Sequence, residues 1–382
     1  MELAAKSTER AARLCQYCVK MCRHACTTHR VTRNDADTPN ARAQIAYKAL
    51  QRGAFAPEEV PYMYQKCANC GLCEEWCETP NMDIGAVMLA ARADIVNQGL
   101  APQSAVEVCQ NVAECGNPYG EAPDERFAKL AGLLEALPSK AETLYFIGCE
   151  TAYRQPEIAI ATIRVLRAAG IDFTVLKSGE FCCGEPQYLL GFWEAAAETA
   201  KRNASSIADC GARRIVFNCP SCLKTFKRGY PERGVTIGEE LELLHLSQLI
   251  EQLVIAERLA LRRPIDKRAT YHDPCELGRR QGIYEAPRTV IKAIRGLQFG
   301  EMLRSGSKAD CCGAGGGLNA TNLPLAIEAS KSTVRMADDV QAELLVTACP
   351  TCKRSFLRHI GQRDGLDALD LVELVALAAG LE

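Results

Sequence analysis

Two short stretches of the sequence, Phe181-Cys182-Cys183-Gly184 and Asp310-Cys311-Cys312-Gly313, share a pattern of two adjacent cysteines followed by glycine. Each pair lies between one upstream cysteine and a downstream Cys-Pro-x-Cys segment. The matching positions lie about 130 residues apart, which predicts a duplicated unit of roughly that length. The two groups, which indicate metal clusters, are Cys149, Cys182, Cys183, Cys219 and Cys222, and Cys275, Cys311, Cys312, Cys349 and Cys352.

The composition is that of an ordinary globular protein. The 382 residues suffice for two or three domains, with a hydrophobic share of 48% and a charged share of 24%. A formal net charge of −2 provides no global field that would attract nucleic acid or an anionic membrane. No apolar run approaches the ~18–20 residues that cross a bilayer, so we expect any membrane connection to go through a partner. The apolar tail Leu371–Leu381 is predicted to be a short docking helix.

The 21 cysteines are expected to be ligands rather than disulfides. They are clustered along a long chain, and Met1–Thr8 lacks the apolar core of a signal peptide. Cytosolic thiols stay reduced and are free to bind metals. The sequence therefore predicts a cytoplasmic protein, peripheral to the inner face of a membrane if a partner holds it there.

Two cysteine runs lie in the N-terminal third, Cys15-x2-Cys18-x3-Cys22-x3-Cys26 and Cys67-x2-Cys70-x2-Cys73-x3-Cys77. The second matches the bacterial ferredoxin run, except that proline comes three residues after the last cysteine, at Pro80. In such runs three thiolates hold one [4Fe–4S] cube and the fourth belongs to the other cube. This assigns Cys15, Cys18, Cys22 and Cys77 to one cube, and Cys67, Cys70, Cys73 and Cys26 to the other.

Structural zinc is the alternative for these runs, because two Cys-x2-Cys pairs can build a four-thiolate zinc site. Zinc ribbons usually use two well-separated pairs, whereas here four closely spaced cysteines occur twice. The spacing therefore favours iron–sulfur cubes over zinc.

Apolar periodicity predicts helices over Asn40–Gln51, Asp83–Gln98 and Pro123–Lys140, and a domain boundary near Ser139. Beyond it, short apolar strands alternate with helices over Pro156–Ala169, Phe192–Asp209 and Asn322–Val340. The strands are predicted at Thr143–Gly148, Ile171–Leu176, Arg214–Asn218, Ala269–His272 and Glu343–Ala348. This pattern predicts an α/β protein with parallel sheets that carry the cysteines at the carboxyl ends of strands. The predicted domains are a mainly helical ferredoxin-like domain, 1–138, and two duplicated units, 139–262 and 263–382.

Glycines follow both vicinal pairs. Neighbouring thiolates in an extended loop diverge, so they suit two different irons of one cluster. Gly184 and Gly313 are predicted cofactor-binding residues, since glycine lets backbone N–H groups approach cluster sulfurs. The run Gly313–Gly317 lacks the Lys-Ser/Thr of a P-loop and the GxGxxG spacing, which disfavours a nucleotide site.

Several polar and thiol side chains are left outside these groups. His272 and Asp273, just before Cys275, can either donate protons or fix the loop, and the second role is favoured. Cys109, Cys115 and Cys210 are expected to be buried, inert thiols.

The whole pattern closely resembles the cysteine-rich CCG-domain proteins, typified by the catalytic subunit of methanogen heterodisulfide reductase. That family includes iron–sulfur subunits of glycolate and lactate oxidases and of anaerobic glycerol-3-phosphate dehydrogenase. The resemblance implies two noncubane [4Fe–4S] clusters, each held by one five-cysteine group, in addition to the two cubes. Both groups are complete, and the resemblance makes their ten cysteines the catalytic residues.

The resemblance implies an iron–sulfur oxidoreductase subunit. Electrons would enter singly through the cubes and reach noncubane clusters that face each other across a cavity, where a disulfide is split. The alternative is a relay between a flavin dehydrogenase and a quinone-reactive, b-type membrane cytochrome. A zinc-stabilised scaffold is a third interpretation. The sequence has no flavin or nicotinamide fingerprint, so electrons are expected to come from a partner subunit such as a flavoprotein.

Overall fold

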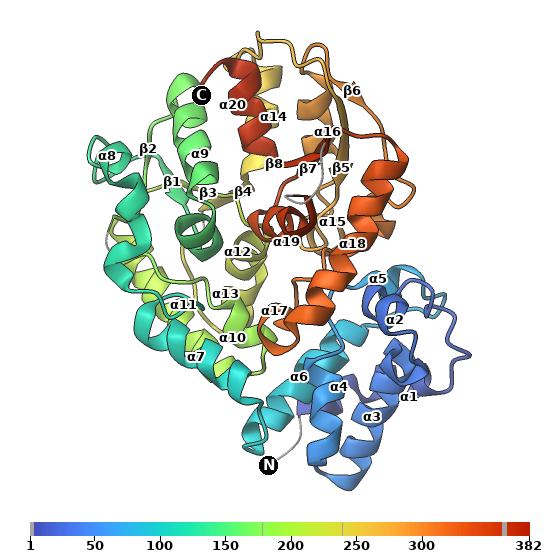
Figure 1. Ribbon diagram of the computed structural model, residues 1–382. Helices are drawn as coiled ribbons and strands as arrows, with labels where there is room; N and C mark the ends of the chain where they lie inside the picture. Colours follow the sequence, from blue (N-terminus) through green and yellow to red (C-terminus); the bar gives the residue numbers. More distant parts are fainter. Residues whose placement is uncertain (1–3, 178, 239, 361–364) are drawn as a thin grey trace.

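The computed structural model describes residues 4–177, 179–238, 240–360 and 365–382. A helical N-terminal region lies against two α/β units (Figure 1). Its two longest helices have side-chain caps: Thr38 accepts a hydrogen bond from Ala41 N–H at the start of α3, and Asp83 does so from Ala86 N–H at the start of α6. The main helices are α1 (Glu9–Gln16), α2 (Thr27–Thr32), α3 (Pro39–Arg52), α4 (Val60–Tyr64), α5 (Leu72–Glu75) and α6 (Ile84–Asn97).

Each α/β unit contains a four-stranded parallel sheet, in the orders β2-β1-β3-β4 and β6-β5-β7-β8. The α/β class with duplicated parallel sheets is therefore confirmed. The strands are β1 (Thr143–Phe146), β2 (Phe173–Thr174), β3 (Arg214–Phe217), β4 (Glu242–His245), β5 (Arg268–His272), β6 (Gln298–Phe299), β7 (Leu344–Thr347) and β8 (Asp367–Asp370).

The two units also contain helices of different lengths. In the first unit they are α9 (Pro156–Ala168), α10 (Glu185–Leu189), α11 (Trp193–Ala208), α12 (Pro220–Lys224) and α14 (Leu246–Ile255). In the second they are α15 (Gly278–Gln281), α16 (Glu285–Lys292), α17 (Leu318–Thr321), α18 (Leu323–Asp339), α19 (Pro350–Ile360) and α20 (Leu371–Ala379).

Some predicted elements differ from those observed. The helix predicted over Pro123–Lys140 is a 3-10 helix, η4 (Pro123–Leu130), followed by the short α8 (Ala131–Leu134). The strand predicted over Ile171–Leu176 shortens to β2. A helix that sequence patterns did not predict, α7 (Gln103–Cys115), packs against α10, α11 and α17. The boundary near residue 139 stays a prediction, since α7 and η4 precede it and yet contact the later units.

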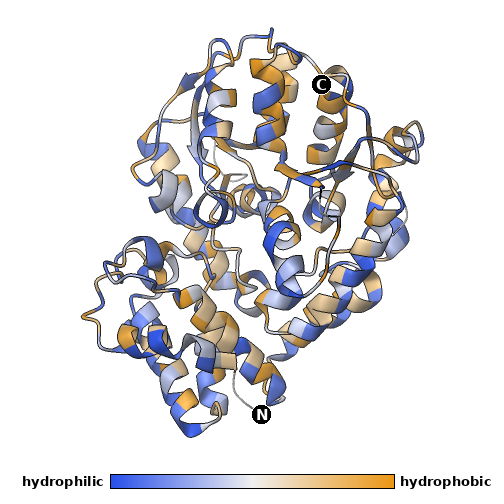
Figure 2. Ribbon diagram, turned by 180° about the vertical axis from the view of Figure 1, so that it is seen from behind, coloured by the Kyte–Doolittle hydropathy of each residue, from blue (hydrophilic) through white to orange (hydrophobic). Residues whose placement is uncertain are grey.

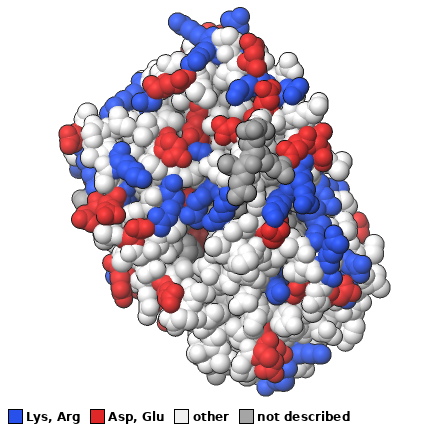
Figure 3. Space-filling model, viewed as in Figure 1, with Lys and Arg blue, Asp and Glu red and all other residues white. Residues whose placement is uncertain are grey.

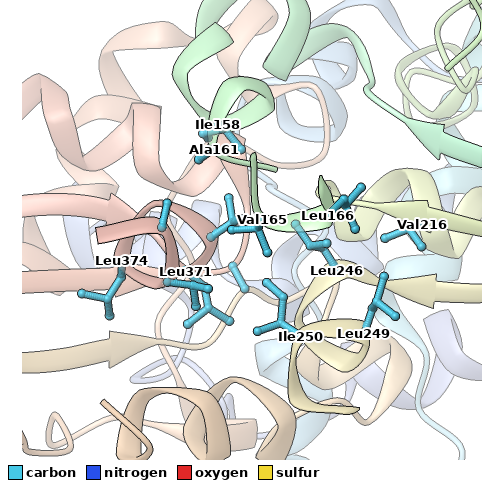
Figure 4. Packing of buried hydrophobic residues seen from close by; sticks show 14 of the residues in the cluster. Ile158, Ala161, Val165, Leu166, Val216, Leu246, Leu249, Ile250, Leu371 and Leu374 are labelled. Atoms are coloured by element: carbon cyan, nitrogen blue, oxygen red, sulfur yellow. The ribbon is translucent and has the colours of Figure 1, made fainter. Parts of the chain in front are cut away.

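One apolar core joins the two units. It contains side chains from α9, α14 and α20 and from strands of both sheets, as Figure 4 shows for Val165, Ile250 and Leu374. The central helices in the upper half of Figure 2 are correspondingly apolar. The predicted docking helix at the end of the chain, α20, packs against α9 of the first unit. A shared hydrophobic core, rather than a surface contact, therefore holds the two units together.

A single buried arginine ties the N-terminal region to both units. Arg92 on α6 is fully buried, and its guanidinium donates to the carbonyls of Met63, Cys67, Leu189 and Gly316 at 2.6–3.0 Å. These carbonyls belong to the N-terminal region, the first unit and the second unit. Within the described residues, no helix is both long and apolar enough to cross a membrane.

Candidate metal centres and the cavity between them

The first vicinal pair lies in one chain of contacting thiols. Hydrogen bonds join Cys149 to Cys182, Cys182 to Cys183, Cys183 to Cys222, and Cys222 to Cys219. Cys149 lies three residues after the end of β1 and Cys219 two residues after the end of β3, in the loops where parallel sheets place their sites. All five predicted residues of the first group thus come together from three segments of the chain.

The second group repeats this arrangement. Thiol hydrogen bonds join Cys275 to Cys311, Cys311 to Cys312, Cys312 to Cys352, and Cys352 to Cys349. Cys275 and Cys349 follow β5 and β7, the counterparts of β1 and β3. The two vicinal pairs therefore occupy equivalent places in the duplicated fold.

The N-terminal cysteines form two further groups, and each group includes one member of the other run. The thiols whose charges act on Cys15 are Cys22, Cys18 and Cys77. Cys26, Cys67, Cys70 and Cys73 line one small cavity beneath α5 and α6. Cys26 and Cys77 thus each lie with the other run, as in a two-cube ferredoxin.

The four thiol groups adjoin one another in series. Cys70, in the loop before α5, accepts a hydrogen bond from the Cys311 thiol, which helps to lower the pKa of Cys70 to about 6. Cys219 lies close enough to Cys349 for its charge to act on that thiol. Cys18, at the opposite end of the series, is exposed. The groups therefore connect a surface thiol to the interior of the α/β units.

Arginines that are buried (Arg42 and Arg126) or half-buried (Arg279) accompany three of the groups. Arg126 lies 3.8 Å from Cys149 Sγ, and Arg42 lies 3.5 Å from Cys26 Sγ. Arg279 donates to Cys70 O at 2.8 Å, and the charges of Cys70, Cys275 and Cys311 act on it. A thiolate cluster carries net negative charge, so a buried cation beside it offsets that charge.

These residues fit iron–sulfur clusters. All 21 cysteines lie in the described part of the chain and carry free thiols. Burial raises the pKa of Cys15 to about 12, so deprotonation there requires a bound metal. No three His, Cys, Asp or Glu side chains in the described ranges converge on a single metal position. The ligands of a four-iron cluster bind different irons and need no such convergence, and an all-thiol donor group suits iron and sulfide.

The loops around the vicinal pairs are held by glycine and by buried polar side chains. Gly313 has a φ of +82° and its N–H donates to Cys311 Sγ at 3.4 Å. Gly184 also has a positive φ and starts α10, where the N–H of the next residue, Glu185, donates to Cys183. Gly316, in the same loop, needs to be glycine for a different reason: a Cβ there would lie 2.5 Å from the carbonyl carbon of Ala68. Both loops therefore bring N–H groups to sulfur.

His272 and Asp273 fix the loop before Cys275. His272 is buried and contacts Asp310 O at 3.0 Å, and burial lowers its pKa. Asp273 makes two hydrogen bonds with the guanidinium of Arg288, at 2.7 and 2.8 Å. This geometry agrees with the role that the sequence favoured for His272 and Asp273, which is to fix the loop rather than to donate protons.

The unassigned cysteines differ in exposure. Cys210 is buried, as expected, but Cys109 and Cys115 are half-exposed on α7. The expectation of burial was wrong for these two because it rested on a segment whose helix was not recognised.

A cavity of about 400 Å³ lies against the first group. All five of its cysteines line the cavity, whereas the cysteines of the second group do not; among its lining residues from the second unit are 314–317 and Thr351, which adjoin that group. The expectation that the two groups face each other across a cavity therefore stays a prediction. Further side chains from α7, α10, α17 and α19 complete the wall.

The arginines are the residues that sequence reasoning missed. Arg279 follows Cys275 by four positions, and this proximity was a usable signal. Arg42 and Arg126 are distant in sequence from the cysteines that they contact, Cys26 and Cys149, so only the fold shows that they are neighbours.

The chain resembles known proteins over the regions that contain these thiol groups. A family model described as "Cysteine-rich domain" (CCG) matches residues 143–227 and 269–356, which include all ten cysteines of the two groups. The chain is 36% identical to one subunit of the dihydromethanophenazine:CoB–CoM heterodisulfide reductase of Methanosarcina barkeri, over 87% of this chain and 84% of that protein. It is 28% identical to one subunit of the fumarate reductase (CoM/CoB) of Methanothermobacter marburgensis, over 86% and 63%. It is 29% identical to EtfAB:quinone oxidoreductase of Syntrophomonas wolfei, over 75% and 42%.

Proposed function

Because this chain belongs to the family of cysteine-rich CCG-domain proteins that includes the heterodisulfide reductase relative, we propose that it reduces a disulfide, or a similar two-electron acceptor, as an iron–sulfur oxidoreductase subunit. One observation carries the proposal: a complete five-thiol group lines a cavity, and a second complete group adjoins it, because residues 314–317 and Thr351 line the cavity and the charge of Cys219 acts on Cys349. A protein that only passed electrons onward would not need such a cavity.

The proposed reaction is R–S–S–R + 2 e⁻ + 2 H⁺ → 2 R–SH. Iron–sulfur clusters, when bound at the four thiol groups, would supply electrons one at a time. The chain itself holds the thiols in place: Glu180 accepts from the N–H groups of Ile147 and Gly148 and pairs with Arg126 behind Cys149. The cavity would hold the acceptor beside the thiols and away from bulk water.

The series of thiol groups supports one order of electron transfer. Electrons would enter near the exposed Cys18, pass the group of Cys26 and Cys70, and reach the second vicinal pair through the contact between Cys70 and Cys311. Cys349 and Cys219 would connect the second group to the first. We therefore propose two cubane sites in the N-terminal region and two noncubane sites in the α/β units.

A relay between a flavoprotein and a b-type membrane cytochrome is the second candidate. It is supported by the resemblance to a protein named as a quinone oxidoreductase. A relay would deliver electrons to a partner rather than to a small molecule in the cavity. The identity of the partners and the cytoplasmic location stay predictions.

Metal content tests the cluster assignment. Two cubes and two four-iron noncubane clusters correspond to about 16 irons per chain in anaerobically purified protein. Cys183→Ser and Cys312→Ser should each lose about 4 irons while the cubes remain. Cys210→Ser, which removes an unassigned buried thiol of the first unit, is the matched control and should keep the full iron content. Unchanged iron in the first two variants, or zinc in place of iron, would refute the assignment.

A turnover assay separates the two functions. Reduced methyl viologen should reduce a small disulfide when the protein is present, and Cys183→Ser should abolish that activity. Clusters that are reduced by viologen without any disulfide turnover would favour the relay.

A further inference from the structure

A second cavity, of about 380 Å³, lies where the N-terminal region meets both α/β units. Its wall includes Leu89 of α6, Tyr188 of α10 and Arg280 of α15, together with side chains of η6 (Thr225–Gly229) and α13 (Tyr230–Glu232). Among the described residues, no cysteine lines it, so the proposed reaction at the thiols does not use this cavity. Its volume lies in the range of small-molecule binding sites.

Arg233, directly after α13, lines this cavity with a guanidinium that has no hydrogen-bond partner. All three of its nitrogens are buried, and none makes a hydrogen bond or an ion pair with any described residue. Its Cζ lies 4.2 Å from the ring centroid of Tyr188. Such a cation–π contact offsets only part of the cost of removing a guanidinium from water. Because arginine has five N–H donors and no acceptor, a ligand that completes this site must supply acceptor oxygens.

The indole of Trp193 points to the same kind of ligand. It stacks on Tyr188 with ring centroids 5.6 Å apart, and it lines the same cavity as Arg233. Its Nε1–H is buried and has no acceptor in the described part of the chain. Buried donors in native proteins nearly always have a hydrogen-bond partner. Two such donor groups in one wall therefore indicate a ligand that accepts hydrogen bonds.

The charges around the cavity favour an anion at Arg233. Two other cations of the wall, Lys224 and Arg280, already pair with glutamates at 2.5–2.9 Å. Basic and acidic side chains are likewise interspersed over the molecular face in Figure 3. The carboxylates of Asp83 and Glu232 also line the cavity, but both side chains are exposed to water and neither pairs with Arg233. Within the described ranges, the buried guanidinium is thus left without a counter-charge.

Gly229 provides the space that the guanidinium occupies. A Cβ at this position would lie 2.6 Å from Arg233 Nη1. The φ of Gly229 is −64°, a helical value that any residue adopts, so the backbone itself does not require glycine. The room beside the guanidinium is therefore the structural reason for glycine here.

We propose that this cavity binds a small molecule through a carboxylate or phosphate group, which accepts hydrogen bonds from the Arg233 guanidinium and the Trp193 indole N–H. Both groups offer several acceptor oxygens, which match the forked donors of arginine. Leu89 and the ring of Tyr188 would contact the rest of the molecule. Because the wall comes from three parts of the chain, the ligand should also stabilise their packing. The inference is independent of the proposed function at the thiols.

Equilibrium binding tests the site. Isothermal titration calorimetry of the anaerobic holoprotein would use inorganic phosphate and acetate as probes at millimolar concentrations. At least one probe should bind, and the preferred probe distinguishes a phosphate-bearing ligand from a carboxylate. Arg233→Gln should weaken that binding about 10- to 100-fold, as expected for the loss of a charged hydrogen bond. Arg233→Lys should retain part of it, because it keeps the charge but loses the fork.

Two further variants separate the site from the fold and from surface charge. Gly229→Ala should also weaken binding, because its Cβ displaces the guanidinium, whereas alanine in place of glycine favours the helix. Lys227→Gln is the matched control, since Lys227 is an exposed cation of η6 that does not line the cavity. It should bind the probe as the parent protein does. Binding of neither probe, equal affinity of the parent and Arg233→Gln, or an equal loss in Lys227→Gln would each overturn the proposal.

The melting temperature provides a second measurement on the same proteins. A ligand that binds only the folded protein raises the melting temperature as its concentration increases. The preferred probe should do so for the parent protein and for Lys227→Gln, but much less for Arg233→Gln. An equal rise for all three proteins would mean that the anion binds elsewhere, and would refute the site at Arg233.

Discussion

Replacing Arg126 by methionine should strongly destabilise the first α/β unit. Arg126 and Glu180 are both almost completely buried, and their closest contact is 2.7 Å. Glu180 also accepts from the N–H groups of Ile147 and Gly148, at 3.0 and 2.9 Å, so it cannot move to water without breaking the loop before Cys149. Arg126→Met leaves that carboxylate buried without a partner, which costs about 3–5 kcal/mol.

The size of the effect can be stated as a melting temperature. A loss of 1 kcal/mol lowers the melting temperature by roughly 2–4 °C in a domain of about 150–250 residues. The substitution should therefore lower it by on the order of 10 °C. It also removes the cation next to Cys149 Sγ, so the iron content of the first group should fall.

A double variant isolates the charge. In Arg126→Met/Glu180→Gln neither member of the pair is charged, but the glutamine oxygen can accept from only one of the two N–H groups, which donate to separate carboxylate oxygens of Glu180. The double variant should regain part of the lost stability, because the uncompensated buried charge is gone while one N–H group loses its acceptor. Differential scanning fluorimetry of anaerobic samples measures all three proteins. A double variant as unstable as Arg126→Met would refute the reasoning, since shape rather than uncompensated charge would then explain the loss.

Two further predictions concern the stability of the fold. Burial lowers the pKa of His245 to about 4, below the ordinary value of about 6.5, so between these pH values the unfolded chain binds a proton that the folded chain does not. The free energy of unfolding should be greatest above about pH 6.5 and fall by up to about 3 kcal/mol toward pH 4. The melting temperature of His245→Asn should depend less steeply on pH over this range than that of the parent protein. An unchanged pH dependence would contradict the mechanism. Gly316→Ala should be strongly destabilising because its Cβ would collide with Ala68 at a φ of +59°. Gly380→Ala, which has a positive φ but open space, should lose only about 1–2 kcal/mol, and similar melting temperatures for both variants would refute the collision.

The thiol groups were predictable from the sequence because their spacing is local and repeated. The duplication located both vicinal pairs, and the ferredoxin-like run anticipated the exchange of Cys26 and Cys77. Edge strands such as β2 and β6 contain only two residues each, too short for any periodic signal. The 3-10 geometry of η4 was also missed, because an amphipathic pattern does not distinguish a 3-10 helix from an α-helix over so few residues.

The cavity beside the first thiol group was not predictable in the same way. Its arginines lie within a few residues of cysteines, but the charge of the wall depends on which side chain each guanidinium contacts. Arg354 and Arg358 are four residues apart on one helix, yet Arg354 forms an ion pair with Glu150 from the other unit, whereas Arg358 donates to the neutral side chain of Asn319. That difference arises from the packing of the two units and has no counterpart in the local sequence.

The hydrogen bonds of the Arg92 guanidinium bear on whether the protein can be produced as two separate fragments. Its acceptor carbonyls lie in three parts of the chain, and none of these contacts depends on the parts being covalently continuous. A break near Pro138 would leave Arg92, on the N-terminal fragment, with two of its carbonyl partners on the other fragment, at Leu189 and Gly316. Two separately produced fragments would then have matching halves of a buried hydrogen-bond network. Each fragment on its own would expose hydrogen-bonding groups whose partners lie on the other fragment. Folded protein should therefore be obtained when the two fragments are co-expressed, but not when either is expressed alone.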